Sequence, residues 1–89
     1  MTQPDSNKSQ NQDFDKKSRL FLCNDDHNTF EYVIGCLIDI CNFDEIQSEQ
    51  LALLAHFNGK TMIKEGDYIY LTVLKQEFDQ RGLTVEIDS

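Results

Sequence analysis

The chain has 89 residues, enough for one small domain and no second lobe. Its formal net charge is −8, and residues 20–89 carry thirteen acidic and four basic side chains. An acidic domain of this kind repels phosphate backbones, so we expect no nucleic-acid partner and a cationic ligand or surface instead.

Cysteine usage and hydropathy bear on the compartment. Cys23, Cys36 and Cys41 have no C-x-x-C spacing, so we expect buried, reduced thiols and neither a redox motif nor a structural zinc site. No apolar run approaches the roughly 18 residues that span a bilayer, and the N-terminus lacks the apolar core of a signal peptide. These features predict a cytoplasmic protein without membrane association.

Residues 1–18 are predicted to form a disordered N-terminal extension. They consist mostly of Asn, Gln, Ser, Asp and Lys, with Phe14 as the single large apolar side chain. Such a composition cannot bury enough surface to offset the entropy cost of ordering. The folded domain is therefore expected over residues 19–89.

The first predicted elements are a strand and a helix. Residues 20–23 form a short apolar run, typical of a central strand, that ends in Asn24-Asp25-Asp26. Asn28 is predicted to cap a helix over residues 29–41, with Glu31 in the reciprocal position. The apolar face of this helix is expected to contain Phe30, Val33, Ile34, Leu37, Ile40 and Cys41.

A second helix is predicted from its two ends. Asp44 is a good N-cap with Gln47 in the reciprocal position, and Asn58-Gly59 is a typical helix stop. Its apolar residues are Ile46, Leu51, Leu53, Leu54 and Phe57. Residues 60–64 are predicted to form the next strand.

A third helix is predicted from residues 66–67 to Arg81, ended by Gly82. Its apolar stripe is expected to contain Tyr70, Val73, Leu74 and Phe78. Residues 83–87 alternate as a strand with one buried face does. The predicted fold is α+β, in the order β-α-α-β-α-β, with a small three-stranded antiparallel sheet packed against three helices.

The sequence resembles the ClpS family of adaptor proteins over residues 19–89. The resemblance rests on the strand running into Asn24-Asp25-Asp26, on Glu31-x-Val33, on Ala55-His56-x-x-Gly59-Lys60 and on Leu83. It implies a non-enzymatic adaptor that binds proteins with a free, bulky hydrophobic N-terminal residue, called an N-degron. It further implies delivery of these proteins to the N-terminal domain of a Clp AAA+ ATPase, ClpA or ClpC with ClpP.

The resemblance also implies a site without cofactor or metal, in a protein expected to be monomeric. The amine-binding residues of the family carry over onto Asn24, Asp25 and His56. Its hydrophobic-pocket positions carry over onto Asn28, Phe30, Val33, Ala52, Ala55 and Leu83.

The chemistry of these side chains supports such a role. An ammonium group has three N–H donors, which must be paired when it leaves water. An amide oxygen, a carboxylate and a neutral imidazole nitrogen are three suitable acceptors, and the carboxylate bond is charge-assisted. Asp26 is expected to brace the loop instead.

The sequence departs from the family in its pocket. Phe30 stands where Met is common, Ala52 and Ala55 stand where larger apolar residues are common, and Asn28 replaces Thr. We therefore expect a pocket that is wider at its base and that prefers aromatic first residues over Leu.

The segment that docks on the ATPase in the family is also shorter here. Glu65, Asp67 and Lys75 are the nearest docking candidates. The sequence is thus also compatible with an interaction domain like that of the ribosomal stalk protein, without protease delivery. A thiol enzyme using Cys23 with His27 or His56 is a weaker alternative. A metal site at residues 25–27 is weaker still.

Overall fold

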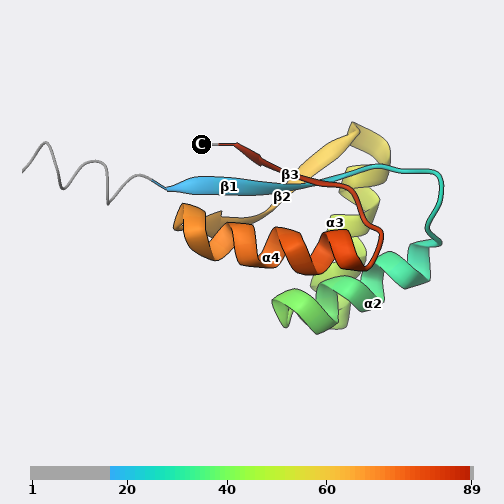
Figure 1. The fold of residues 1–89 in the computed structure, drawn as a ribbon. Coiled ribbons are helices and arrows are strands. Elements are labelled where there is room, and N and C mark those ends of the chain that lie inside the picture. Colours follow the sequence, from blue (N-terminus) through green and yellow to red (C-terminus); the bar gives the residue numbers. More distant parts are fainter. Residues whose placement is uncertain (1–16, 89) are drawn as a thin grey trace, which may run out of the picture.

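The computed structural model describes residues 17–88 (Figure 1). Its elements are β1 (Ser18–Cys23), α2 (Phe30–Cys41), α3 (Glu45–Asn58), β2 (Lys60–Gly66), α4 (Tyr68–Gln80) and β3 (Val85–Asp88). The predicted order β-α-α-β-α-β is confirmed. None of the helices within residues 17–88 is long and apolar enough to cross a membrane.

β1 is the central strand of an antiparallel sheet with the order β2-β1-β3. Leu20 and Leu22 on this strand are buried, as the apolar run predicts. β1 begins at Ser18, the residue that was expected to end the disordered extension. Residues 1–16 of that extension lie outside the described residues.

The three helices lie on one side of the sheet (Figure 1). α3 and α4 contact the strands, and α2 packs against both of these helices. The interior between these layers is filled by one apolar cluster, in which Leu20, Leu37, Leu71 and Phe78 are fully buried. One modest core is what a chain of this size is expected to form.

The N-cap of α2 differs from the prediction. Thr29 is the cap, and its hydroxyl accepts the backbone N–H of Tyr32 at 3.1 Å. Asn28 does not cap the helix because its side-chain amide is bonded elsewhere, to Asp25 and to Gly82. The predicted cap of α3 is correct: Asp44 accepts the backbone N–H of Gln47 at 2.7 Å.

The buried face of α3 does not consist of the large apolar residues noted in the sequence. The helix buries three small residues, Ser48, Ala52 and Ala55, and Leu51 packs partly against the core. The large apolar residues Ile46, Leu53, Leu54 and Phe57 are exposed. Small side chains let the helix backbone approach its neighbours closely, which turns the bulky face toward solvent.

The buried stripe of α4 agrees with the prediction at Leu74 and Phe78 and differs from it in the remaining residues. Leu71, Leu74 and Phe78 are buried, whereas Tyr70 and Val73 are about half exposed. Leu71 and Phe78 are separated by two helical turns and Leu74 lies between them, so the three form one face. The sequence prediction had included the residues that flank this face.

Candidate functional site

Two backbone hydrogen bonds fix the end of β1. The N–H of Cys23 donates to the carbonyl oxygen of Thr84 at 2.9 Å, and the N–H of Asn24 donates to that of Gly59 at 2.8 Å. Gly59 directly follows α3, and its left-handed φ of 89° lets the chain turn there into β2. Asn24 therefore lies beside the last turn of α3, which carries His56.

The Asp25 carboxylate organises the loop between β1 and α2. Its Oδ1 accepts the backbone N–H groups of His27 and Asn28, each at 3.0 Å. The side-chain amide of Asn28 donates to both oxygens, at 3.3 Å for Oδ1 and 3.2 Å for Oδ2. Oδ1 thus receives three hydrogen bonds and Oδ2 receives one. The Oδ2 atom keeps the larger spare capacity for a ligand.

These contacts keep Asp25 ionised. Partial burial alone would raise the pKa of Asp25. The hydrogen bonds from Asn28 and His27 have a larger, opposite effect, so the pKa of Asp25 lies below its ordinary value. The carboxylate is therefore negatively charged at neutral pH. It is suited to pair with a cation at the rim of the fold.

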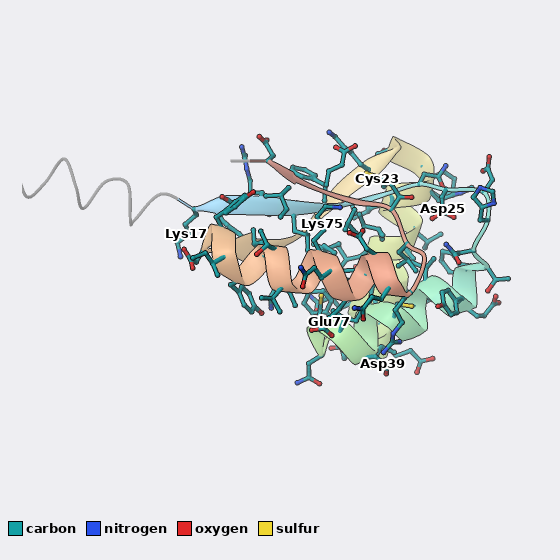
Figure 2. The ribbon with its side chains drawn as sticks, viewed as in Figure 1. Lys17, Cys23, Asp25, Asp39, Lys75 and Glu77 are labelled. Carbon is teal, nitrogen blue, oxygen red and sulfur yellow. The ribbon has the colours of Figure 1, made fainter. Side chains whose placement is uncertain are left out.

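Asn28 connects this carboxylate to another part of the chain. Its side-chain amide also donates to the carbonyl oxygen of Gly82 at 2.9 Å, in the turn between α4 and β3. Asp25 is thereby held at the end of the sheet far from Lys17 (Figure 2). The loop is braced by Asp25 and Asn28, and not by Asp26, which is exposed.

A cavity of about 400 Å³ opens beside this loop, between the end of β1 and the facing sides of α2 and α3. It is lined by Leu22, Cys23, Asn24, Asp25, Asp26, Asn28, Phe30, Val33, Ala52, Leu53, Ala55 and His56. A cavity of roughly 150 Å³ holds a benzene molecule. This one is therefore large enough for a bulky side chain and the backbone attached to it.

The cavity brings together most of the residues singled out in the sequence. The three expected amine-binding residues, Asn24, Asp25 and His56, all line it. So do the pocket candidates Asn28, Phe30, Val33, Ala52 and Ala55. Leu83 does not line it and lies instead in the core, with 4 % of its surface exposed. Its side chain belongs to the buried cluster.

Leu22, Cys23, Asp26 and Leu53 line the cavity without having been expected to do so. In the sequence, Leu53 is noted only as one of the apolar residues of this helix. Its place in the cavity could have been predicted from helix geometry. Leu53 directly follows Ala52 and precedes His56 by three residues, so it lies on the same side of α3 as His56.

The Cys23 thiol in the cavity lacks the lowered pKa of a nucleophilic cysteine. Burial raises the pKa of the Cys23 thiol, and the nearby Glu86 carboxylate raises it further. The thiol is therefore protonated at neutral pH, whereas a nucleophilic cysteine needs a lowered pKa. Residues 17–88 also contain no group of three side chains arranged to hold a metal ion.

The docking candidates lie away from this cavity. Glu65 is near the end of β2 that pairs with the start of β1, and Asp67 precedes α4. Lys75 lies further along α4, where it pairs with Asp79 at 3.2 Å and donates to the carbonyl oxygen of Val85 at 3.3 Å.

Comparison of the sequence with family models identifies the chain. The model described as "ATP-dependent Clp protease adaptor protein ClpS" matches residues 14–86. The chain belongs to the ClpS family. A comparison with curated proteins gave no match.

A solved structure has the same fold. It is that of ClpS2 from Agrobacterium tumefaciens bound to L-phenylalaninamide, which is 20 % identical in sequence and superposes with a TM-score of 0.76. The similarity covers 82 % of this chain and 95 % of that one. The ClpS fold is therefore present nearly in full.

Proposed function

We propose that this ClpS-family protein binds the free N-terminus of proteins whose first residue is bulky and apolar, and passes them to a Clp AAA+ ATPase. The observation that carries the proposal is one cavity in which apolar walls meet three acceptor side chains. The structural relative binds L-phenylalaninamide, a molecule with a free amine and an aromatic side chain. Both groups have matching chemistry in this cavity.

The amine would be bound at the rim. Asp25 offers a carboxylate oxygen with spare capacity, and its charge makes the bond to an ammonium group stronger than a neutral one. Asn24 and His56 line the same cavity and have exposed side chains. An amide oxygen and a neutral imidazole nitrogen would complete the set of three acceptors that an ammonium group requires.

The first side chain would be bound between α2 and α3. Val33, Ala52 and Ala55 form apolar wall there, and burial of each CH₂ group contributes about 0.8 kcal/mol. The two alanines leave width and the Phe30 ring adds a flat aromatic surface. We therefore expect Phe and Tyr at the first position to be preferred over Leu, and Ala to bind weakest.

This function is tested by fluorescence anisotropy with labelled peptides that differ only at the first residue. A Phe-initiated peptide is expected to bind, and its N-acetylated form is not, because acetylation removes the charge and two donors. Asp25→Ala should weaken binding by a factor of about 100 or more, since a charge-assisted bond is lost and the loop loses its brace.

Asp26→Ala is the matched control, because it removes a carboxylate from the same cavity while the loop contacts of Asp25 stay in place. It should bind nearly as the wild type does. Equal binding of the free and acetylated peptides would contradict an amine site. Tighter binding of the Leu-initiated peptide would contradict the aromatic preference alone.

Delivery would use a different surface. The first half of α4 exposes Tyr68, Ile69, Tyr70 and Val73, close in sequence to Glu65 and Asp67. This surface lies toward the opposite end of the sheet from Asn24, so an ATPase domain and a substrate can bind at the same time. We assign the protein to the cytoplasm as a monomer. Titration with the isolated N-terminal domains of ClpA and ClpC would identify the ATPase.

A further inference from the structure

A second hollow lies on α3, next to the proposed N-terminus site. It has a volume of about 300 Å³ and is lined by Gln50, Leu53, Leu54 and Phe57. Leu53 lines both this hollow and the main cavity, so the two lie next to each other with this side chain between them. The hollow therefore adjoins the site on α3.

The walls of this hollow are large apolar side chains that the core does not use. Phe57 is 75 % exposed and Leu54 is 45 % exposed. The helix already meets the core through Ser48, Ala52 and Ala55. Gln50, Leu53, Leu54 and Phe57 share one outward face because they are three or four residues apart. Three apolar side chains gathered on a solvent-facing surface are typical of a binding surface.

We propose that this hollow binds an apolar side chain at the second or third residue of the bound N-terminal segment. The inference rests on the proposed function, because it takes the ammonium group to lie at His56. The ring centroids of His56 and Phe57 are 5.2 Å apart. Because Phe57 is a wall of the hollow, this spacing approximates the distance from the bound amine to the hollow. An extended peptide advances about 3.4 Å per residue, so one or two residues span it. The ligand class is thus a free N-terminus with a bulky first residue and an apolar residue shortly after it.

Charge favours this occupant over a second copy of the chain. Residues 20–89 carry thirteen acidic and four basic side chains, so two copies repel each other. Glu49 is exposed one helical turn before Leu53 and adds negative charge near the hollow. A peptide that enters from the main cavity brings an amine and meets no such repulsion. The shared wall at Leu53 and the charge therefore point to the same ligand.

The test uses two labelled peptides that both begin with Phe and differ only at residues two and three, Leu-Leu in one and Ser-Ser in the other. The wild type should bind the Leu-Leu peptide about tenfold more tightly, as expected for partial burial of a leucine side chain. Phe57→Ser should abolish most of this difference. Leu54→Ser, which leaves the Phe57 ring in place beside His56, should reduce it with the affinity for the Ser-Ser peptide unchanged.

Ile46→Ser is the matched control: Ile46 is 70 % exposed on the same helix but does not line the hollow. It should keep the tenfold preference. Leu54→Ser provides a second test of the hollow if Phe57→Ser fails to fold by circular dichroism.

Equal binding of the two peptides by the wild type, with Phe-initiated binding intact, would overturn the second subsite and leave the proposed function standing. Failure of both peptides to bind would overturn the function itself. Sedimentation velocity closes the remaining possibility: a wild-type dimer that Phe57→Ser converts to a monomer would assign the hollow to self-association and overturn the subsite.

Discussion

At the scale of single residues, one carboxylate holds the loop and keeps an oxygen available for the proposed amine. Asp25 uses Oδ1 to hold the backbone of His27 and Asn28, and leaves Oδ2 with one hydrogen bond. Asn28 fixes the carboxylate in this orientation, because its side-chain amide donates to both oxygens and to the Gly82 carbonyl oxygen. In the proposed function, Asn28 would therefore act on the bound amine through Asp25, as a positioning residue.

Asn28→Ala tests this coupling. The substitution removes the side-chain donors that lower the pKa of Asp25, so that pKa should rise toward its ordinary value. A carboxylate with a lowered pKa stabilises the fold above its unfolded pKa, and this stabilisation is lost as pH falls through the folded pKa. The variant should thus lose less stability on acidification. Binding of a Phe-initiated peptide at pH 7 should weaken about three- to tenfold.

Carbon-detected NMR of the Asp25 carboxyl group, followed from pH 2 to pH 6, measures the pKa directly. Thr29→Ala is the control, because it removes the α2 cap and should reduce stability by about 1 kcal/mol. Its Asp25 titration should match the wild type. An unchanged Asp25 pKa in Asn28→Ala would show that the Asn28 side chain does not stabilise the charged form of Asp25.

At the scale of the elements, the ends of helices could be predicted from the sequence better than their faces. Asp44 and Gly59 bound α3 as expected because capping and left-handed turns depend on residues next to each other. The buried face of α3 depends on what packs against it. One side of α3 carries large apolar residues and another carries the small residues Ser48, Ala52 and Ala55. The small side is buried, because the neighbouring elements pack close to the helix.

The N-cap of α2 is a second feature that the local sequence does not determine. Asn28 and Thr29 are both good N-caps, so the local sequence does not choose between them. The choice is made by Asp25 and Gly82, which bind the Asn28 side chain. Gly82 is 54 residues away in the sequence. Most residues of the cavity could nevertheless be predicted, because their spacing in the sequence matches the family.

Two glycines test how local geometry supports the site. Gly59 has φ +89°, which L-residues rarely adopt, and Gly35 lies inside α2 with no atom within 4 Å of an added Cβ. Gly59→Ala should lower the free energy of unfolding by about 1–2 kcal/mol and weaken peptide binding, because Asn24 bonds to Gly59. Gly35→Ala should raise it by about 0.5–1 kcal/mol with binding unchanged.

Urea unfolding measured by circular dichroism gives both free energies. The opposite signs of the two substitutions make each the control of the other. A stable Gly59→Ala protein with full peptide affinity would show that the turn after α3 does not position Asn24.

At the scale of the whole molecule, the fold separates two surfaces along the sheet. The cavity lies where β1 ends and β2 begins, and the exposed residues at the start of α4 lie near the other end. One small core supports both surfaces, so a change in core stability affects them together. The core also holds the Cys41 thiol, whose ionisation would oppose folding.

The Cys41 thiol makes the stability of the fold decrease at high pH. Burial raises the pKa of this thiol to about 11, and Glu77 raises it against the opposing effect of Lys64. Because the ordinary value is 9.0, the unfolded chain loses this proton first as pH rises. The contribution to stability is therefore fully present below pH 9 and is lost progressively toward pH 11.

Urea unfolding at intervals from pH 8 to pH 10.5 should show a decline in stability that is smaller in Cys41→Ala than in the wild type. The comparison matters because tyrosines and lysines also titrate in this range. Cys41→Ala should cost about 1 kcal/mol at pH 8, where the thiol is neutral and only packing is lost. The two curves should then converge as pH rises, since the wild type alone bears the cost of keeping the Cys41 thiol protonated. Parallel curves would show that Cys41 ionises as readily in the folded protein as in the unfolded chain.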